Sequence, residues 1–202
     1  MRMYLGTQPL DKAIIGGNAG MLRVGFEKQD ENILYELPSP VTFTGNTDEA
    51  IDTGVKLWEQ DISFTIDMSL ALEPKSSEQY AFSIFSENFK GIKFGIHPTA
   101  ATPSYYFCYG NGSYNNIKLT NLPLTYSGDC RVVITHAAGE LIYTIAYTIE
   151  SGNYTHTITM PKAFSAKSTT LLLGCDYGFE PAKARAWVGT IYTFKIIGGD
   201  PI

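Results

Sequence analysis

The chain has few cysteines and no long apolar run. Its 202 residues include three cysteines, Cys108, Cys130 and Cys175. An odd, widely spaced set without a C-x-x-C pair argues against a disulfide framework and a zinc site, so we expect buried free thiols. No apolar run approaches the roughly 20 residues of a membrane-spanning helix, and the N-terminus lacks the apolar core of a secretory signal. These absences predict that the chain does not insert into a membrane. They also predict that it is synthesised in a cytoplasm.

Charge is also scarce. Charged residues make up 17% of the chain and the formal net charge is −5, whereas roughly 25% charged residues is typical. Without a basic excess the chain has no field to gather phosphates, so no nucleic-acid partner is expected. Thr, Ser, Asn and Tyr must therefore supply much of the wetted surface, which suits neutral partners such as glycans. The 44% apolar content is enough for one good core.

Strand patterns separated by turn clusters fill the chain from Ile33 onward, and only residues 161–167 could hold a helical turn. Apolar residues alternate with mostly polar ones over residues 62–72, which predicts a long half-buried strand. In the next pattern Ile92, Phe94 and Ile96 alternate with Lys93 and His97. This phase places Lys93 and His97 on the outer face of a strand that Pro98 ends.

Residues 131–136, 140–149 and 154–160 predict three consecutive antiparallel strands, because both linkers carry the glycine that tight turns favour. The middle strand has one apolar face and one Thr-rich face, as in a sandwich whose outer face is wet. In the last strand Gly189 and Ile191 are out of phase with Phe194 and Ile196. We expect a β-bulge there, with Thr193 as the extra residue. The fold class is therefore all-β, a two-sheet antiparallel jelly-roll sandwich.

The first 32 residues differ from the rest and form a separate segment, with the sandwich domain over residues 33–202. Tyr4-Leu5-Gly6 and Ile14-Ile15-Gly16 are a weak two-fold repeat of an apolar pair closed by glycine. The many glycines disfavour a helix there. Such short extended pieces need another surface or other copies of themselves, so we interpret Tyr4, Leu5, Gly6, Ile14, Ile15 and Gly16 as attachment residues.

Catalytic chemistry has little support. A glycoside hydrolase needs two carboxylates across the scissile bond, but Glu59 and Asp61 precede the strand and Asp67 stands alone on it. His97, His136 and His156 lie on different predicted strands, which favours half-buried sheet residues over a metal or catalytic set. We expect no enzyme and no cofactor. A Ca²⁺ at the rim would need several converging oxygen ligands, but Asp176, Asp48, Glu49 and Asp129, which could offer them, come from separate loops.

Aromatic and amide side chains give a better lead, because sugars lay ring faces on Tyr while Asn and Asp take their hydroxyls. The candidates in the segment 103–116 and at the strand end after Cys175 are Tyr105, Tyr109, Asn111, Tyr114, Asn115, Asn116, Asp176 and Tyr177. Tyr105 and Tyr109 could equally be one face of a strand. The turn residues Asn111, Tyr114, Asn115 and Asn116 are freer candidates.

Residues 33–202 resemble the laminin-G/concanavalin A-like jelly-roll family. The resemblance rests on LPSPVTFTG at 37–45, IDTGVKL at 51–57, SFTI at 63–66, RVVITH at 131–136 and WVGTI at 187–191. It implies a concanavalin A-like sandwich, a fold that binds ligands more often than it transforms them.

The N-terminal segment is similar to the openings of bacteriophage structural proteins, in which a repeated Y-L-G-x-x-x-[IV]-x-K pattern precedes an adhesion domain. Met3-Tyr4-Leu5-Gly6-Thr7 carries the likeness, while the second copy lacks the Tyr and the following Lys. The resemblance implies a virion protein, assembled in the host bacterial cytoplasm, that contacts other virion proteins through this segment and host-surface glycans through the sandwich. Such fibre proteins are often homo-oligomers, trimers among them. Two alternatives stay open: a capsid or tail structural or decoration protein without glycan binding, and a jelly-roll glycoside hydrolase.

Overall fold

The computed structural model describes residues 31–57, 63–86, 90–97, 104–111, 114–140, 142–159, 170–177 and 183–199, and four short strands before them. The chain divides into two compact units, Met1–Glu31 and Asn32–Ile202. The predicted helical turn at 161–167 and the acidic residues Glu59 and Asp61 lie outside the described residues, as does Gly6. In the described part of the chain, no helix has the length and apolar character needed to cross a membrane.

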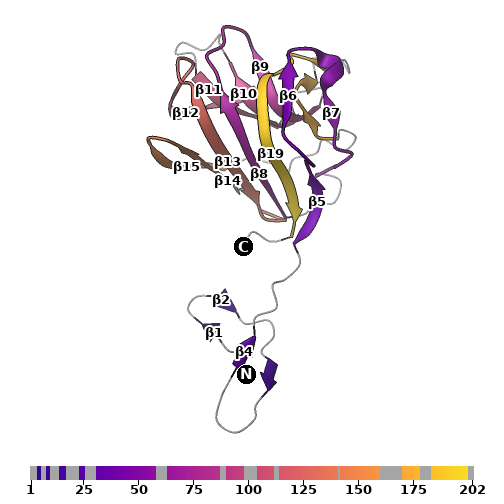
Figure 1. Cartoon of the computed structure of the whole chain (residues 1–202), viewed down its shortest axis with the longest axis vertical. Coiled ribbons are helices and arrows are strands. Elements are labelled where there is room, and N and C mark those ends of the chain that lie inside the picture. The colour runs from indigo at the N-terminus through magenta and orange to yellow at the C-terminus, as the bar shows by residue number, and fades with distance from the viewer. Residues whose placement is uncertain are drawn as a thin grey trace. The chain divides into compact units, whose positions relative to one another are not determined.

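Two antiparallel sheets form the second unit (Figure 1). The seven-stranded sheet has the order β15-β14-β13-β8-β19-β5, with β6 also paired to β19. Its strands are β5 (Asn32–Glu36), β6 (Val41–Thr44), β8 (Phe64–Leu72), β13 (Gly128–His136), β14 (Ile142–Ile149), β15 (Gly152–Thr159) and β19 (Val188–Gly198).

The six-stranded sheet has the order β12-β11-β10-β9-β16-β7. Its strands are β7 (Ile51–Asp52), β9 (Gln79–Ser86), β10 (Lys90–Ile96), β11 (Ser104–Asn111), β12 (Tyr114–Pro123) and β16 (Leu172–Leu173). A 3-10 turn, η1 (Thr47–Glu49), precedes β7, and a small hairpin of β17 (Asp176–Tyr177) and β18 (Lys183–Ala184) follows β16. The predicted all-β, two-sheet antiparallel sandwich is confirmed.

The core lies between the two sheets, and alternation along the strands builds it. In β8 every second side chain is buried, starting at Phe64 and ending at Leu72, as the sequence predicts. In β14 the predicted apolar face is buried from Tyr143 to Ile149, while Ile142 and Thr148 on the other face are exposed. Burial of these rows against the opposite sheet stabilises the fold at about 25 cal/mol per Å² of apolar surface.

Strand limits differ modestly from those predicted. β13 begins at Gly128, three residues before the predicted start, because Gly128, Asp129 and Cys130 pair with the end of β8 although glycine and aspartate are poor strand formers. β15 begins at Gly152 and pairs directly with Ile149, so the turn between β14 and β15 is shorter than predicted.

A β-bulge interrupts β19 where the sequence predicts one. Ile191 lies opposite Leu70 and Thr193 lies opposite Ser69, so the extra residue is Tyr192 and the predicted Thr193 is wrong. Tyr192 and Thr193 are both exposed, while Ile191 and Phe194 on either side are buried. The bulge therefore lets both halves of the strand point their apolar residues into one core.

The three cysteines are buried free thiols, as predicted. His136 is buried in phase with Val132 and Ile134, and its ring stacks on Tyr143 with 4.3 Å between centroids. His156 is half-buried and its ring lies 5.8 Å from that of Tyr147. Both histidines are therefore sheet residues, as the strand phase predicts.

In the first unit, each of the two repeated apolar pairs begins a two-stranded ribbon. β1 (Tyr4–Leu5) pairs with β2 (Gln8–Pro9), and β3 (Ile14–Gly16) pairs with β4 (Arg23–Gly25). Tyr4, Leu5, Ile14, Ile15 and Gly16, the expected attachment residues, thus lie on extended chain, as the sequence predicts.

Candidate functional site

A buried ion pair lies on the face of the six-stranded sheet that points away from the core. The Lys93 ammonium, on β10, is 2.8 Å from Oδ2 of Asp176, which opens β17. Only 2% of the Lys93 side chain and none of the Asp176 side chain is exposed. Burying two charges in this way is costly unless further hydrogen bonds complete the site.

Two more side chains donate hydrogen bonds to the Asp176 carboxylate. The Ser83 hydroxyl on β9 donates to Oδ1 at 2.9 Å, and the Arg185 guanidinium donates through Nη2 to Oδ2. Burial raises the pKa of Asp176, while Lys93, Arg185 and Ser83 oppose that rise. Two cations and a hydroxyl on one carboxyl group favour its ionised form.

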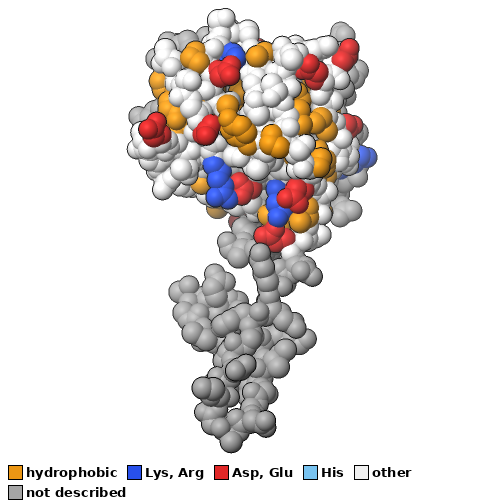
Figure 2. All heavy atoms as spheres, viewed as in Figure 1, with side chains coloured by type: hydrophobic (Ala, Val, Ile, Leu, Met, Phe, Trp, Pro, Cys, Tyr) orange, Lys and Arg blue, Asp and Glu red, His pale blue; other side chains and the backbone are white. Residues whose placement is uncertain are grey.

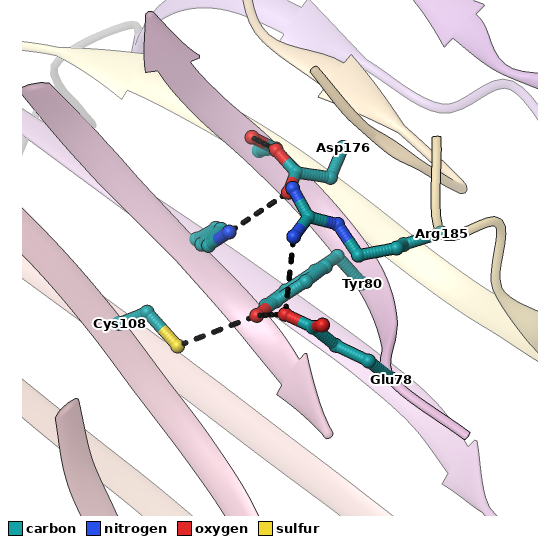
Figure 3. A network of polar contacts seen from close by, with 7 residues as sticks. Glu78, Tyr80, Cys108, Asp176 and Arg185 are labelled. Atoms are coloured by element: carbon teal, nitrogen blue, oxygen red, sulfur yellow. Dashed lines mark hydrogen bonds and ion pairs between the residues drawn. The ribbon is translucent and has the colours of Figure 1, made fainter. Parts of the chain in front are cut away.

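Tyr80, on β9, joins this pair to a second carboxylate (Figure 3). Its hydroxyl donates to Oε1 of Glu78 at 2.6 Å and lies 3.9 Å from the Cys108 sulfur, which donates to it. The Lys93 ammonium lies 3.9 Å from the centroid of the Tyr80 ring, and the Arg185 guanidinium carbon lies 5.4 Å from it. Both distances are within the range of cation–π attraction.

A second β-bulge is what brings Tyr80 to this face. Phe94 lies opposite Phe82 and Gly95 lies opposite Tyr80, so Ala81 is the extra residue. The Ala81 carbonyl accepts a hydrogen bond from the Gly174 amide at 2.8 Å. Gly95 makes room for the crossing, because a Cβ there would lie 2.0 Å from the Gln79 carbonyl oxygen and 2.7 Å from the Tyr80 ring. Bulges commonly re-aim a side chain in this way.

Arg185 is held by its backbone as well as by its side chain. Its φ of 51° is the one positive value of a non-glycine residue in the described ranges, a conformation that costs such a residue energy and that the surrounding contacts must enforce. Its carbonyl accepts from the Tyr80 amide at 3.1 Å, and Ala186 forms a bridge with Tyr80. The strained residue therefore sits at a fixed place beside β9.

Together, these contacts form one cluster of Lys93, Asp176, Ser83, Tyr80, Glu78 and Arg185. Arg185 and Glu78 form its open rim. Their side chains are 21% and 27% exposed, and Nη1 of Arg185 lies 3.3 Å from Oε1 of Glu78. Further along the same face, Tyr106 on β11 is 6% exposed and its ring meets the His97 ring edge-on at 6.0 Å. The cluster presents a paired donor and acceptor next to aromatic rings, with two cations balanced by two anions.

Asp176 is the one predicted site residue that lies in the cluster, and it is buried at the centre, not at the surface. Lys93 lies on the predicted outer face, but it is covered by the chain around β17. The ligand-binding role predicted for Tyr105 is wrong for a surface site, because Tyr105 is fully buried in the core and its hydroxyl donates to the Glu73 carbonyl at 2.8 Å. Tyr109 is half-buried and packs against the same core.

The amide-segment residues Asn111, Tyr114, Asn115 and Asn116 lie on strands, whereas the sequence suggests a turn. Asn111 ends β11 opposite Lys90, and Tyr114, Asn115 and Asn116 begin β12 opposite Gly110, Tyr109 and Cys108. These strands lie two and three places from β9 in the sheet, so this group and Asp176 are not brought together. Tyr177 pairs with Lys183 in the hairpin; its side chain and those of the four amide-segment residues lie outside what the structure describes.

Glu78, Tyr80, Ser83 and Arg185 are the members of the cluster that the sequence analysis missed. Tyr80 has the same sequence phase as the core residues Phe82 and Ile84, and only the bulge at Ala81 takes it out of that phase. Arg185 lies in a short stretch between two strands that carries no motif. The E-x-Y spacing of Glu78 and Tyr80 was the available signal, since residues two apart in extended chain point to the same side.

Of the acidic residues considered for a rim Ca²⁺, Glu49 has another role. The Glu49 carboxylate accepts from the Thr44 amide and hydroxyl, each at 2.6 Å, and these hydrogen bonds lower its pKa. The Asp48 amide is held by Asn46 at the start of η1. Across the described ranges, no three His, Cys, Asp or Glu side chains gather as a metal site requires.

Comparison by sequence finds nothing: no family model fits the chain, and no curated protein matches it. Comparison by structure finds the same fold elsewhere. The IT-sialidase CBM40 of Ruminococcus gnavus bound to α2,6-sialyllactose is 9% identical, with a TM-score of 0.58 over 81% of this chain and 92% of that one. The same module bound to α2,3-sialyllactose has a TM-score of 0.58 at 10% identity, covering 81% of this chain and 91% of that one.

Larger sialidases contain the fold as one part. The NanB sialidase of Streptococcus pneumoniae is 11% identical, with a TM-score of 0.56 over 85% of this chain and 27% of that one. The leech intramolecular trans-sialidase is 14% identical, with a TM-score of 0.55 over 86% of this chain and 27% of that one. The chain therefore corresponds to about a quarter of those two proteins, and the likeness is one of fold.

Proposed function

We propose that this chain is a non-enzymatic carbohydrate-binding protein whose glycan contacts the rim of the buried cluster, at Arg185 and Glu78. The observation that carries the proposal is the fixed pairing of these two partly exposed side chains over a buried ionic support. Arg185 is anchored by Asp176 and by its backbone, and Glu78 by the Tyr80 hydroxyl. Sites that bind well hold their contact residues through a second layer of hydrogen bonds.

The charge of the cluster favours a hydroxyl-rich ligand. Lys93 and Arg185 balance Asp176 and Glu78, so no net charge is left to attract a strongly anionic partner. Glu78 uses Oε1 for both its contacts in the described part of the chain, which leaves Oε2 to accept from sugar hydroxyls. The half-buried His97 ring, which the buried Tyr106 ring meets edge-on at 6.0 Å, provides aromatic surface against which a sugar ring can lie.

The structural relatives support the class of ligand. Two of them are complexes of one module with sialyllactose, and they share this fold over most of their length. Because the identity is near 10%, their binding residues do not carry over, and the site proposed here rests on the residues of this chain.

The setting that we propose is a bacteriophage virion, with the sandwich displayed toward host-surface glycans. The likeness of residues 3–7 to phage structural proteins supports this setting, as does the division of the chain into a short first unit and a sandwich. Tyr4, Leu5, Gly6, Ile14, Ile15 and Gly16 would attach the chain to other virion proteins. Detection of the chain in purified particles, and its loss when residues 1–31 are removed, tests this part separately from glycan binding.

Binding of the full chain to an array of neutral and sialylated glycans tests the proposed function. We expect retention on a defined set of glycans, weakened about tenfold by Glu78→Gln, which removes the charge of the acceptor, and by Arg185→Lys, which replaces the planar guanidinium with a single ammonium. Arg131→Ala is the matched control, because Arg131 forms an exposed ion pair with Asp67 on the other sheet. No retention on any glycan overturns the proposal, and equal effects of all three variants would move the site away from this rim.

The same preparation tests the absence of catalysis. We expect every glycan that the protein retains to be recovered with unchanged mass after prolonged incubation. Release of a shorter or rearranged sugar would show that the chain is an enzyme.

A further inference from the structure

The ends of the two sheets differ in how they are protected against pairing with another chain. Four strands lie at the ends of the sheet orders: β15 and β5 in one sheet, β12 and β7 in the other. An edge strand presents a row of backbone amides and carbonyls to any strand that approaches it, and proteins usually block such edges with charge, proline, irregularity or short length.

Three of these edges carry such protection. β12 contains Lys118, ends at Pro123 and has a register shift against β11. β7 is two residues long. β5 ends in Glu36, and its pairing with β19 shifts register between Ile196 and Ile197.

β15 has none of these devices. Its eight residues, GNYTHTIT, include no Lys, Arg, Asp, Glu or Pro, and all eight pair with β14 in unbroken register. On the outer side, Asn153, Thr155, Thr157 and Thr159 are exposed. On the inner side, the Tyr154 ring stacks on Tyr147 with 5.0 Å between centroids, which fixes the strand in place. Figure 1 shows β15 as the last strand at its end of the sheet, and in the described ranges no other strand pairs with it.

We propose that β15 pairs antiparallel with the β15 of a second copy of this chain, so that the two seven-stranded sheets become one continuous sheet. Its own copy is the partner that this strand fits best. The two strands have equal length, both are regular, and no like charges meet although each chain carries a net charge of −5. A two-fold axis makes the contact self-complementary, and main-chain hydrogen bonds supply its affinity.

The pleat limits the register of this pairing. Residues directly opposite each other in an antiparallel ladder point to the same face, and Thr155 and Thr157 both lie on the outer face. When the two eight-residue strands overlap most fully, Thr155 of one copy therefore faces either Thr155 or Thr157 of the other. In both registers the outer face of the junction is uncharged, with Thr–Thr pairs at its centre and Asn153 opposite a threonine on either side, and such cross-strand threonine pairs are favourable.

A double lysine variant of the full chain tests the proposal in both registers. Thr155→Lys with Thr157→Lys places lysine opposite lysine across the two-fold axis, whichever register forms. Sedimentation of the unaltered chain should show a reversible dimer, and the variant should associate at least about tenfold more weakly. Thr144→Lys with Thr148→Lys is the matched control on β14, one strand inward, and should leave the dimer unchanged.

The outcomes are distinct. An unaltered chain that stays monomeric at about 100 µM, well above the range of specific self-association, overturns the proposal. So does an assembly that persists in Thr155→Lys with Thr157→Lys, because the contact then lies elsewhere. If the variant fails to fold, hydrogen exchange of the unaltered chain decides the matter: amides of residues 152–159 should become more protected as protein concentration rises, and no change in them refutes the pairing.

Discussion

Lys93 and Asp176, 83 residues apart in the chain, form an ion pair 2.8 Å long that solvent does not reach. The pair fastens the chain around β17 to the outer face of β10, and Asp176 in turn holds Arg185 at the rim. The proposed ligand-binding rim thus depends on a charge pair that the ligand would not touch.

The two partners of this ion pair should differ in how much each contributes to stability. Asp176→Asn leaves two cations facing a neutral amide, and we expect it to cost about 3–5 kcal/mol. Lys93→Met leaves the carboxylate with Arg185 and Ser83, so its cost should be smaller, about 1–3 kcal/mol. Urea unfolding of both variants measures the difference.

A double variant and a surface control complete this test. Lys93→Met combined with Asp176→Asn should be more stable than Asp176→Asn alone, because it removes a buried cation that has lost its carboxylate. Arg131→Ala, which breaks the exposed pair with Asp67, should cost under about 1 kcal/mol. Simple addition of the two single losses in the double variant would contradict the coupling.

Gly174 should be far less replaceable than Gly139, although both have left-handed backbones with φ of 79° and 75°. A Cβ on Gly174 would lie 2.1 Å from Cε1 of Phe43, which is buried in the core, whereas nothing lies within 4 Å of one on Gly139. Gly139→Ala should cost about 1–2 kcal/mol for the backbone, and Gly174→Ala about 2 kcal/mol more for overpacking. Equal losses in thermal or urea unfolding would show that Phe43 moves aside freely.

Much of the sandwich could be predicted because its strands alternate cleanly. β8, β13 and β14 each bury every second residue, and the sequence shows that pattern directly. The bulge in β19 was predictable from the change of phase, but its extra residue was not. Tyr192 and Thr193 are both exposed, so either would satisfy the phase, and only the pairing of Thr193 with Ser69 decides between them.

The candidate site was harder to predict because its parts meet through long-range contacts. The phase of β10 gives the face of Lys93, but the cover over it comes from residues far along the chain. Tyr80 reaches the site through an inserted residue that no periodicity reveals. The distribution of surface charge does not mark the candidate site either. Charged side chains are sparse on the face shown in Figure 2, and most of the Lys and Arg side chains there lie beside an Asp or Glu, so no patch of one sign stands out.

Alkaline pH should unfold the protein through two buried groups. Burial raises the pKa of the Cys130 thiol from 9.0 to about 12, and burial is also the main cause that raises the pKa of Tyr105. Both groups are neutral when protonated, and the unfolded chain releases these protons at lower pH than the folded one. Their contribution to stability is therefore complete below about pH 9 and is lost as pH rises through the range from 9 to 12.

Unfolding free energies between pH 8 and 11 measure this effect. Each released proton steepens the decline by up to about 1.4 kcal/mol per pH unit, so Cys130→Ala and Tyr105→Phe should each flatten it. Tyr105→Phe should also cost about 1 kcal/mol at neutral pH, because the hydrogen bond to the Glu73 carbonyl is lost. A decline of unchanged slope in both variants would show that other groups control alkaline stability.

The bulge in β19 predicts which single residue the last strand can lose. Without Tyr192, Thr193 would follow Ile191 directly, and Ile191 and Phe194 would alternate as in a regular strand, so both would still point into the core. Deleting Thr190 instead keeps the bulge but reverses the inward and outward phase of the residues before it, which turns the buried Trp187 away from the core.

We expect the Tyr192 deletion to fold cooperatively with a loss of about 1–2 kcal/mol. The Thr190 deletion should be insoluble or unfolded, because burial of a Trp is worth about 3–5 kcal/mol. Circular dichroism and thermal unfolding of the two deletions compare them directly, and equal tolerance of both would mean that the bulge does not set the register of this strand.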